Sequence, residues 1–482
     1  SFSSAFAENL VETVYGLVQG FDYATESGNL AEIFLGIPFA APPVGDRRLE
    51  KPIPPSKWST TLQADKFGPH CVTHYPIFFP GSEDCLYLNI FRPKEPSPDA
   101  AGYPVVVWIH GGAYVFGDTE LYGYKHISNN FVEKGLVFVS VTYRLGPFGY
   151  FSSNDSRVPS NLGLWDLTQS LKFLHQVLPS FGGDTSRITI MGHSAGSGSV
   201  SWLTASPESN DLFAQAIEMS GSVYSHWSSS SNIVARWSKK FATAVGCDYD
   251  AKDLKQCLKN APLEDFLAVG KNYPVFDVGE TFAMFNPRID GDFLKASNFD
   301  EAFETAPGKP TLFGLTTQEG LLWSAQVLPV FAENRPFYLS SESQKRYSRN
   351  DLVAYIRDFV ATESGFGKRR FEAANDLVQF YTKGEDENSD SLFYFERFTQ
   401  LLSDMFFVVP HLREIQKKQP TASKSFLYLY DHDLPQKTTS FQIKGTTHAA
   451  EWTPLFGIYF FGGPFGFTEA DKQAQKNFVE MF

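Results

Sequence analysis

The stretch Arg187-Ile188-Thr189-Ile190-Met191 runs directly into Gly192-His193-Ser194-Ala195-Gly196. The first five residues predict a strand, and the small residues that follow, Ser197 to Leu203, can open a helix. A strand, a sharp turn and a helix in this order are typical of a G-x-S-x-G nucleophile elbow, although a glycine turn can also be purely structural. The glycines suit such an elbow because a β-carbon at either position would clash where strand and helix meet. We therefore interpret Ser194 as a candidate nucleophile.

The runs around this elbow predict an α/β fold. From Tyr103 onward, β-rich runs alternate with helix-compatible stretches such as Leu164 to Val177, and the runs are Val105 to Ile109, Val137 to Tyr143, Ile188 to Met191, Pro310 to Leu315 and Phe426 to Tyr430. This alternation predicts a large, mixed, mostly parallel central sheet with helices on both faces. The segments 232–270 and 340–420 read as helical insertions into a single domain spanning 1–482. Near the N-terminus, Val11 to Val18 and Ile33 to Phe39 predict strands of a small antiparallel sheet.

Composition excludes several classes of protein. The chain has 482 residues, of which 43% are hydrophobic and 20% charged, which is typical of a globular protein. Its 41 Lys and Arg against 54 Asp and Glu give a net charge of −13, the wrong sign for a nucleic-acid partner. No apolar run reaches the roughly 18 residues of a membrane span, so we expect none in this chain.

The four cysteines fall into two couples that are close in sequence, Cys71 with Cys85 and Cys247 with Cys257. This arrangement suggests two short disulfide-closed loops, while four buried thiols in a reducing compartment stay the alternative. The sequence contains neither C-x-x-C nor H-E-x-x-H, so we expect no zinc site.

A serine nucleophile needs a histidine base and a carboxylate that orients it, in the chain order serine, acid, histidine for this type of elbow. Glu319 follows the run Pro310 to Leu315, and His448 follows Phe426 to Tyr430, so the order matches. Other residues compete on spacing alone: His411 lies in a predicted helix, His432 stands at a strand end, and Asp290 and Asp292 form an Asp-Gly-Asp turn.

Acyl transfer also needs backbone donors for a developing oxyanion. His110-Gly111-Gly112-Ala113 directly follows the predicted strand Val105 to Ile109. We expect the amides of Gly111, Gly112 and Ala195 to form a three-donor oxyanion hole. Without the elbow, the two glycines would read as an ordinary turn.

Taken together, these residues resemble the type-B carboxylesterase and cholinesterase family of α/β-hydrolases over essentially the whole chain. The similarity is carried by five ordered motifs: Phe34-Leu35-Gly36-Ile37-Pro38-Phe39-Ala40, Glu83-Asp84-Cys85-Leu86-Tyr87-Leu88-Asn89, Tyr143-Arg144-Leu145-Gly146, Asn161-Leu162-Gly163-Leu164, and Phe181-Gly182-Gly183-Asp184 through Gly192-His193-Ser194-Ala195-Gly196. The resemblance implies a catalytic triad of Ser194, Glu319 and His448. It also implies the disulfides Cys71 to Cys85 and Cys247 to Cys257, and the ion pairs Arg48 with Glu83 and Arg144 with Asp166.

The chain departs from cholinesterases where these bind a quaternary ammonium group. The segment between Cys71 and Cys85 is short and lacks Trp, and His193 replaces the usual Glu before the nucleophile, so we do not expect a cationic substrate. Trp227 resembles an acyl-pocket position, although it could equally be a core residue. In its overall sequence pattern, the chain most resembles the invertebrate gut-type carboxylesterases.

The resemblance implies a serine carboxylesterase that acts on small-molecule esters and needs no metal or organic cofactor. An acyltransferase using the same acyl-enzyme with an alcohol or sugar acceptor, and a non-catalytic adhesion protein on the same fold, are the alternatives. Asn154-Asp155-Ser156 is an acceptor pattern for N-glycosylation, which fits a secreted or endoplasmic-reticulum enzyme. The chain stops at Phe482, where the resemblance leads us to expect further C-terminal residues.

Overall fold

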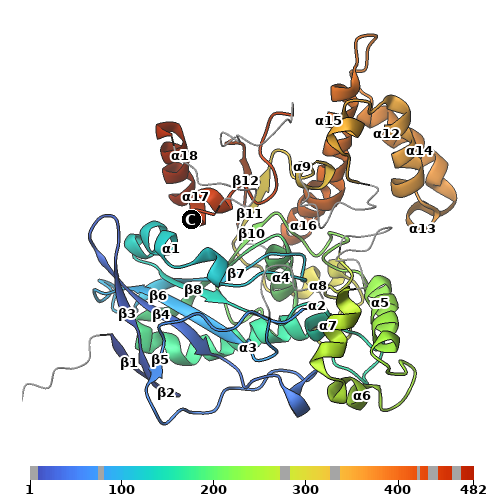
Figure 1. The fold of residues 1–482 in the computed structure, drawn as a ribbon. Coiled ribbons are helices and arrows are strands. Elements are labelled where there is room, and N and C mark those ends of the chain that lie inside the picture. Colours follow the sequence, from blue (N-terminus) through green and yellow to red (C-terminus); the bar gives the residue numbers. More distant parts are fainter. Residues whose placement is uncertain are drawn as a thin grey trace, which may run out of the picture.

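A computed structural model of the protein describes residues 9–73, 81–271, 283–325, 337–420, 424–432, 443–458 and 468–482. Its main sheet consists of the strands β3 (Phe21–Ala24), β4 (Leu30–Pro38), β6 (Tyr87–Pro93), β7 (Tyr103–Ile109), β8 (Val137–Val141), β9 (Gly183–His193), β10 (Gln215–Met219), β11 (Thr311–Thr316) and β12 (Ser425–Tyr430). Their order in the sheet is β12-β11-β10-β9-β7-β8-β6-β4-β3. Figure 1 shows β12, β11 and β10 toward one end of the sheet and β6, β4 and β3 toward the other. Neighbours from β12 to β8 are parallel, and β6, β4 and β3 extend the sheet in antiparallel fashion. The predicted large, mostly parallel sheet is confirmed.

The N-terminal region forms a separate three-stranded sheet of β1 (Leu10–Thr13), β2 (Gly16–Gln19) and β5 (Leu62–Gln63). The prediction of one strand over Val11 to Val18 is wrong, because β1 and β2 are two arms of an antiparallel hairpin. Gly16 makes this turn with φ +139°, and an added Cβ there would lie 2.5 Å from the Trp58 ring. β5 adds to β2 in parallel, so the small sheet is mixed and not purely antiparallel as predicted. The predicted strand Ile33 to Phe39 does not belong to it, because β4 pairs with β6 and β3 in the main sheet.

The side chains of β7 show how the main sheet is buried on both faces. Val105, Val107 and Ile109 belong to one core cluster, and Val106 and Trp108 belong to the other. The first cluster includes α3 (Leu162–Val177) and α4 (Ala195–Ala205), whereas the second includes α1 (Lys125–Asn130), α17 (Trp452–Phe456) and α18 (Glu469–Val479). Helices therefore cover both faces, and a central strand is apolar at every position, as parallel buried strands require.

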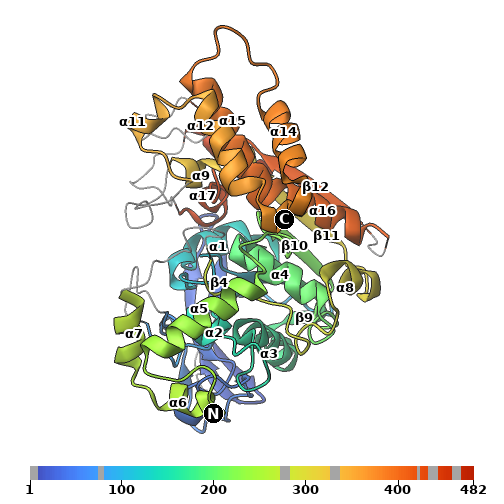
Figure 2. The same ribbon diagram turned by 90° about the vertical axis from the view of Figure 1, so that its right-hand side faces the viewer.

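The remaining helices are α2 (Gly146–Tyr150), α5 (Ser231–Ala244), α6 (Leu254–Asn260), α7 (Leu263–Lys271), α8 (Phe299–Thr305), α9 (Leu321–Ser324), α11 (Ser341–Gln344), α12 (Arg349–Tyr355), α13 (Glu363–Phe366), α14 (Arg370–Tyr381), α15 (Ser391–Ser403) and α16 (Val409–Lys418). Short 3₁₀ turns are η1 (Gly45–Arg47), η2 (Glu120–Tyr122), η3 (Val132–Lys134), η4 (Leu178–Phe181) and η6 (Gly367–Arg369), and π-helical turns are η5 (Ile356–Val360) and η7 (Asp404–Val408). Figure 2 shows α11 to α15 projecting from the sheet body, and we call residues 337–420 the helical arm. Within the described residues, every helix is too short or too polar to cross a membrane.

Covalent and ionic links implied by the resemblance are present. Disulfides join Cys71 to Cys85 and Cys247 to Cys257. Arg48 pairs with Glu83 at 2.5 Å, and Arg144 pairs with Asp166 at 2.7 Å. The Arg144 and Asp166 side chains are 4% and 0% exposed, so this pair is an internal link between the end of β8 and α3.

Candidate active site

Ser194 stands at the junction of β9 and α4 with φ +56° and ψ −121°, a backbone conformation that costs a non-glycine residue of order 1–3 kcal/mol. The flanking glycines are required by close packing. An added Cβ at Gly192 would come within 2.3 Å of the Gly196 carbonyl oxygen, and one at Gly196 within 2.0 Å of the Ile109 carbonyl oxygen. The strained elbow expected from the sequence is therefore present.

Glu319 and His448 meet in a buried hydrogen bond. Glu319 follows β11, is fully buried, and its Oε2 accepts a 2.6 Å bond from His448 Nδ1. Its Oε1 accepts from Ser220 Oγ at 2.5 Å and from the Thr316 amide at 2.8 Å. With three donors around it, this carboxylate is fixed in place and orients the imidazole.

Two loops distant in sequence bring these residues together. The Gln318 amide donates to the Thr446 carbonyl at 2.9 Å, and the Thr446 amide donates to Thr317 Oγ1 at 2.9 Å. The loop that carries Glu319 and the loop that carries His448 are thus hydrogen-bonded to each other just before these two side chains.

His448 is linked to the elbow through aromatic contacts. Its ring lies 4.6 Å from the ring of His193, the residue before Ser194, and 4.6 Å from the ring of Phe407 on η7. Ser194 and His448 are only 8% and 3% exposed. The geometry thus gathers a strained serine, an imidazole and a fixed carboxylate at the ends of β9 and β11.

The glycine-rich loop after β7 lies against Ser194. An added Cβ at Gly111 would be 3.1 Å from Ser194 Cβ, and one at Gly112, where φ is +118°, would be 2.0 Å from the Phe116 carbonyl oxygen. Tyr143 Oη holds this loop by donating to the His110 carbonyl at 2.8 Å. Ala195 is the buried first residue of α4. Backbone groups from β7 and α4 therefore flank the serine, as an oxyanion site requires.

Trp227 is buried close to the histidine. Its Nε1 donates to the Phe406 carbonyl at 2.9 Å, and its ring lies 5.7 Å from the ring of Phe407, which also contacts His448. The π-helical turn η7 thus connects the predicted acyl-pocket residue with the imidazole.

The competing residues have structural partners of their own. His432 Nε2 lies 2.8 Å from Asp471 Oδ1, and His411 Nε2 lies 3.3 Å from the Glu218 carbonyl. Asp290 Oδ1 accepts backbone amides from residues 292–294, as expected of a turn, and Asp292 pairs with Lys51 at 2.7 Å.

Sequence reasoning missed two members of the site. Ser220, whose φ is +56°, donates to Glu319, and the fully buried Glu451 Oε2 lies 3.8 Å from His193 Nε2. The sequence pattern predicted no strand before Ser220, and only the structure shows that Ser220 directly follows β10. Glu451 stands three residues after His448, but this spacing alone does not predict that its carboxyl group is buried.

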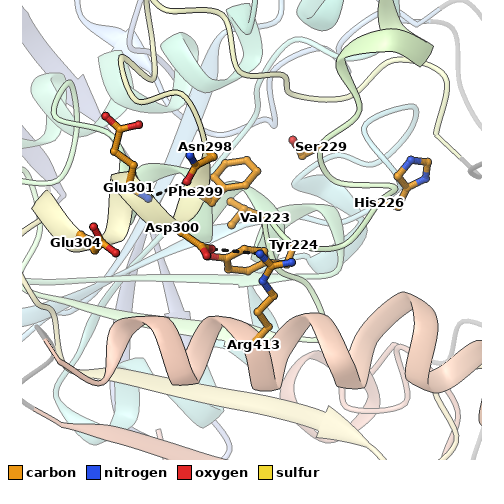
Figure 3. Close-up of a pocket in the computed structure, with 10 residues that line it drawn as sticks. All are labelled: Val223, Tyr224, His226, Ser229, Asn298, Phe299, Asp300, Glu301, Glu304 and Arg413. Carbon is orange, nitrogen blue, oxygen red and sulfur yellow. Dashed lines mark hydrogen bonds and ion pairs between the residues drawn. The ribbon is translucent and has the colours of Figure 1, made fainter. Parts of the chain in front are cut away.

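Figure 3 shows a pocket with a volume of about 620 Å³ beside α8 and α16. It is lined by Val223, Tyr224, His226, Ser229, Asn298, Phe299, Asp300, Glu301, Glu304 and Arg413, which include no member of the predicted triad. Tyr224 Oη donates to Asp300 Oδ1 at 2.6 Å, and Arg413 pairs with the same carboxylate at 3.3 Å. The most buried charged group of this pocket, the Asp300 carboxylate, is therefore already paired with other residues that line it.

Comparison with known proteins agrees with this architecture. The model of the carboxylesterase family matches residues 7–482. The chain is 34% identical to gut esterase 1 of Caenorhabditis briggsae, over 100% of the chain and 84% of that protein, and 35% identical to gut esterase 1 of Caenorhabditis elegans, over 99% and 84%. It is also 34% identical to esterase FE4 of Myzus persicae, over 75% of the chain and 63% of that protein. With the α/β-hydrolase sheet and elbow in place, the chain belongs to the carboxylesterase family.

Proposed function

We propose that this carboxylic ester hydrolase works through an acyl-enzyme on Ser194. His448 takes the hydroxyl proton as Ser194 Oγ bonds to the ester carbonyl carbon, and Glu319 stabilises the imidazolium. The amides of Gly111, Gly112 and Ala195 donate to the oxyanion. The carbon–oxygen bond to the alcohol then breaks, His448 protonates the leaving alcohol, and water releases the acid by the same steps. The observation that carries the proposal is the buried 2.6 Å bond between Glu319 and His448, whose ring contacts the residue before a strained serine.

Substitution of the proposed nucleophile and base tests this mechanism. Ser194→Ala and His448→Ala should each lower kcat for a p-nitrophenyl ester by about a millionfold, because the triad acts as a unit. His432→Ala is the matched control, since His432 also faces a carboxylate, that of Asp471, away from the elbow. It should keep wild-type turnover, and thermal unfolding should show all variants folded. Retained turnover in folded Ser194→Ala protein would refute the proposal.

We also propose that Trp227 lines the acyl side of the site, because Phe407 joins its ring to that of His448. Two disulfides favour an oxidising compartment, either outside the cell or in the endoplasmic reticulum. Asn154 is an exposed residue, which suits a glycan acceptor in that compartment.

A further inference from the structure

His193 is the last residue of β9 and is packed against the proposed base. Its side chain is fully buried, with ring centroids 4.6 Å from His448 at an interplanar angle of 40° and 5.1 Å from Trp452 at 72°. An added Cβ at Gly111 would lie 3.5 Å from its Nδ1. The His193 ring is therefore packed against the proposed base, Trp452 and the glycine-rich loop.

The polar atoms of His193 are left without hydrogen bonds. Within the described part of the chain, neither ring nitrogen has a hydrogen-bond partner, and the carboxyl group that the ring faces is that of Glu451. The shortest contact of this pair, Nε2 to Oε2, is 3.8 Å. A charged pair with both side chains fully buried is expected to form a direct hydrogen bond, so two neutral groups fit the 3.8 Å separation better.

Electrostatics agree with a neutral pair. Burial lowers the pKa of His193 well below its ordinary value, and the nearby His448 lowers it further. Burial raises the pKa of Glu451 well above its ordinary value, and the charge of Glu319 adds to this effect. At neutral pH, His193 is therefore uncharged, and Glu451 keeps its proton to a higher pH than an ordinary carboxyl group does.

The other groups facing these rings come from several elements. Glu319, on the loop after β11, and Glu451, in the segment 443–458, contact the rings of His448 and His193 directly. Tyr428 on β12 and His411 on α16 interact electrostatically with Glu319. The loop after β7 and η7 contribute the uncharged Gly111 and Phe407. Glu319 is thus the one carboxylate among these groups that is hydrogen-bonded to the base.

We propose that His193 is a positioning residue, whose uncharged ring holds the His448 imidazole against Glu319 and sets the pH at which ester hydrolysis begins. The inference rests on the proposed function. A carboxylate in place of this ring would lie within about 5 Å of the imidazolium and stabilise it, whereas an amide would not. Hydrolysis would then need a higher pH to begin.

The matched variants His193→Glu and His193→Gln differ only in this charge. We would measure kcat and KM for a p-nitrophenyl ester from pH 5 to 9, and count active sites with an organophosphonate. The acid limb of kcat/KM should lie about one pH unit or more higher for His193→Glu than for His193→Gln. His193→Ala should lower kcat about tenfold with KM nearly unchanged, because the base loses its ring neighbour.

The carboxyl group of Glu451 lies beside the introduced carboxyl group and can share its proton with it. The same comparison is therefore repeated with Glu451→Gln present. The proposal is supported if the acid limb of kcat/KM lies higher for His193→Glu than for His193→Gln in either background. Identical limbs for the glutamate and glutamine variants in every background that folds, or wild-type kcat in His193→Ala, would overturn it. If wild-type protein fails to react with the organophosphonate, the proposed function fails instead, so the two failures are distinguishable.

Discussion

At the scale of single residues, Glu451 is a carboxyl group enclosed three residues after His448. Because burial raises its pKa well above the ordinary 4.5, the folded protein holds a proton that the unfolded chain releases. This contribution to stability is fully present below about pH 4.5 and is lost as pH rises through the folded-state pKa.

Glu451→Gln replaces the protonated carboxyl by an amide of the same shape that cannot ionise. The free energy of unfolding of the variant, relative to wild type, should therefore increase between pH 5 and pH 8, measured by denaturant titration at each pH. Glu387→Gln, a change at an exposed position, serves as control and should show no such trend. A difference that is constant with pH would mean that Glu451 is ionised in the folded protein.

Residues of the site differ in how far sequence could predict them. The elbow at Ser194 was predictable because its glycines are forced by backbone contacts that any such turn has to make. Chain order allowed Glu319 and His448 but left other acids and histidines in competition, and it was the resemblance to the family that favoured these two. The contacts of His193 and Glu451 depend instead on how the segment 443–458 packs against β9, and no local pattern encodes that burial.

At the scale of elements, Asp300 fastens α8 to α16 beside the pocket of Figure 3. Hydrogen bonds from Lys417 and Tyr224, with Arg413 nearby, lower the pKa of Asp300 to about 2. The carboxylate therefore contributes stability above the unfolded pKa of 3.8, and this contribution disappears as pH falls towards 2.

Asp300→Asn should lower the free energy of unfolding at pH 7 by about 1 kcal/mol, a modest value because the side chain is 33% exposed. The difference from wild type should shrink on acidification. Glu304→Gln removes the same charge from α8 at an exposed position and should cost less. An equal decrease in the free energy of unfolding for both variants would show that stability depends only on the net charge of this region.

Elements were predicted least well where one residue changes the path of the chain. Gly16 divides the expected strand Val11 to Val18 into a hairpin, since its φ of +139° is open to glycine. The π-helical turn η7 was not predictable, because the helical pattern of 340–420 continues through it. Yet this turn places Phe406 and Phe407 beside Trp227 and His448.

At the scale of the whole molecule, a buried ionic cluster joins the helical arm to the central sheet. Lys418 Nζ lies 2.7 Å from Glu218 on β10 and 2.6 Å from Glu414 on its own helix, and all three side chains are at most 8% exposed. Ser201 and Ser222 also donate to Glu414. Burial alone would lower the pKa of Lys418, but the two carboxylates raise it.

The sequence could not predict this cluster. A glutamate and a lysine four residues apart on a polar helix are typical of an exposed pair, and only the docking of α16 on β10 buries them. The same docking fixes η7, which directly precedes α16 and carries the ring of Phe407 to His448.

Lys418→Met should therefore destabilise the protein by about 3–5 kcal/mol, because it leaves two buried carboxyl groups without their cation. Lys417→Met is the matched control, since the neighbouring lysine is 36% exposed and pairs with Asp300 at the surface, and it should cost under about 1 kcal/mol. Adding Glu218→Gln to Lys418→Met removes one orphaned carboxyl and should recover part of the loss in denaturant titrations. Equal losses for the two lysine variants, or no recovery in the double variant, would show that the arm is held by apolar packing. If the cluster does hold it, the less stable Lys418→Met protein should also lose ester turnover at temperatures below its unfolding midpoint, because Phe407 reaches His448 only while α16 is docked.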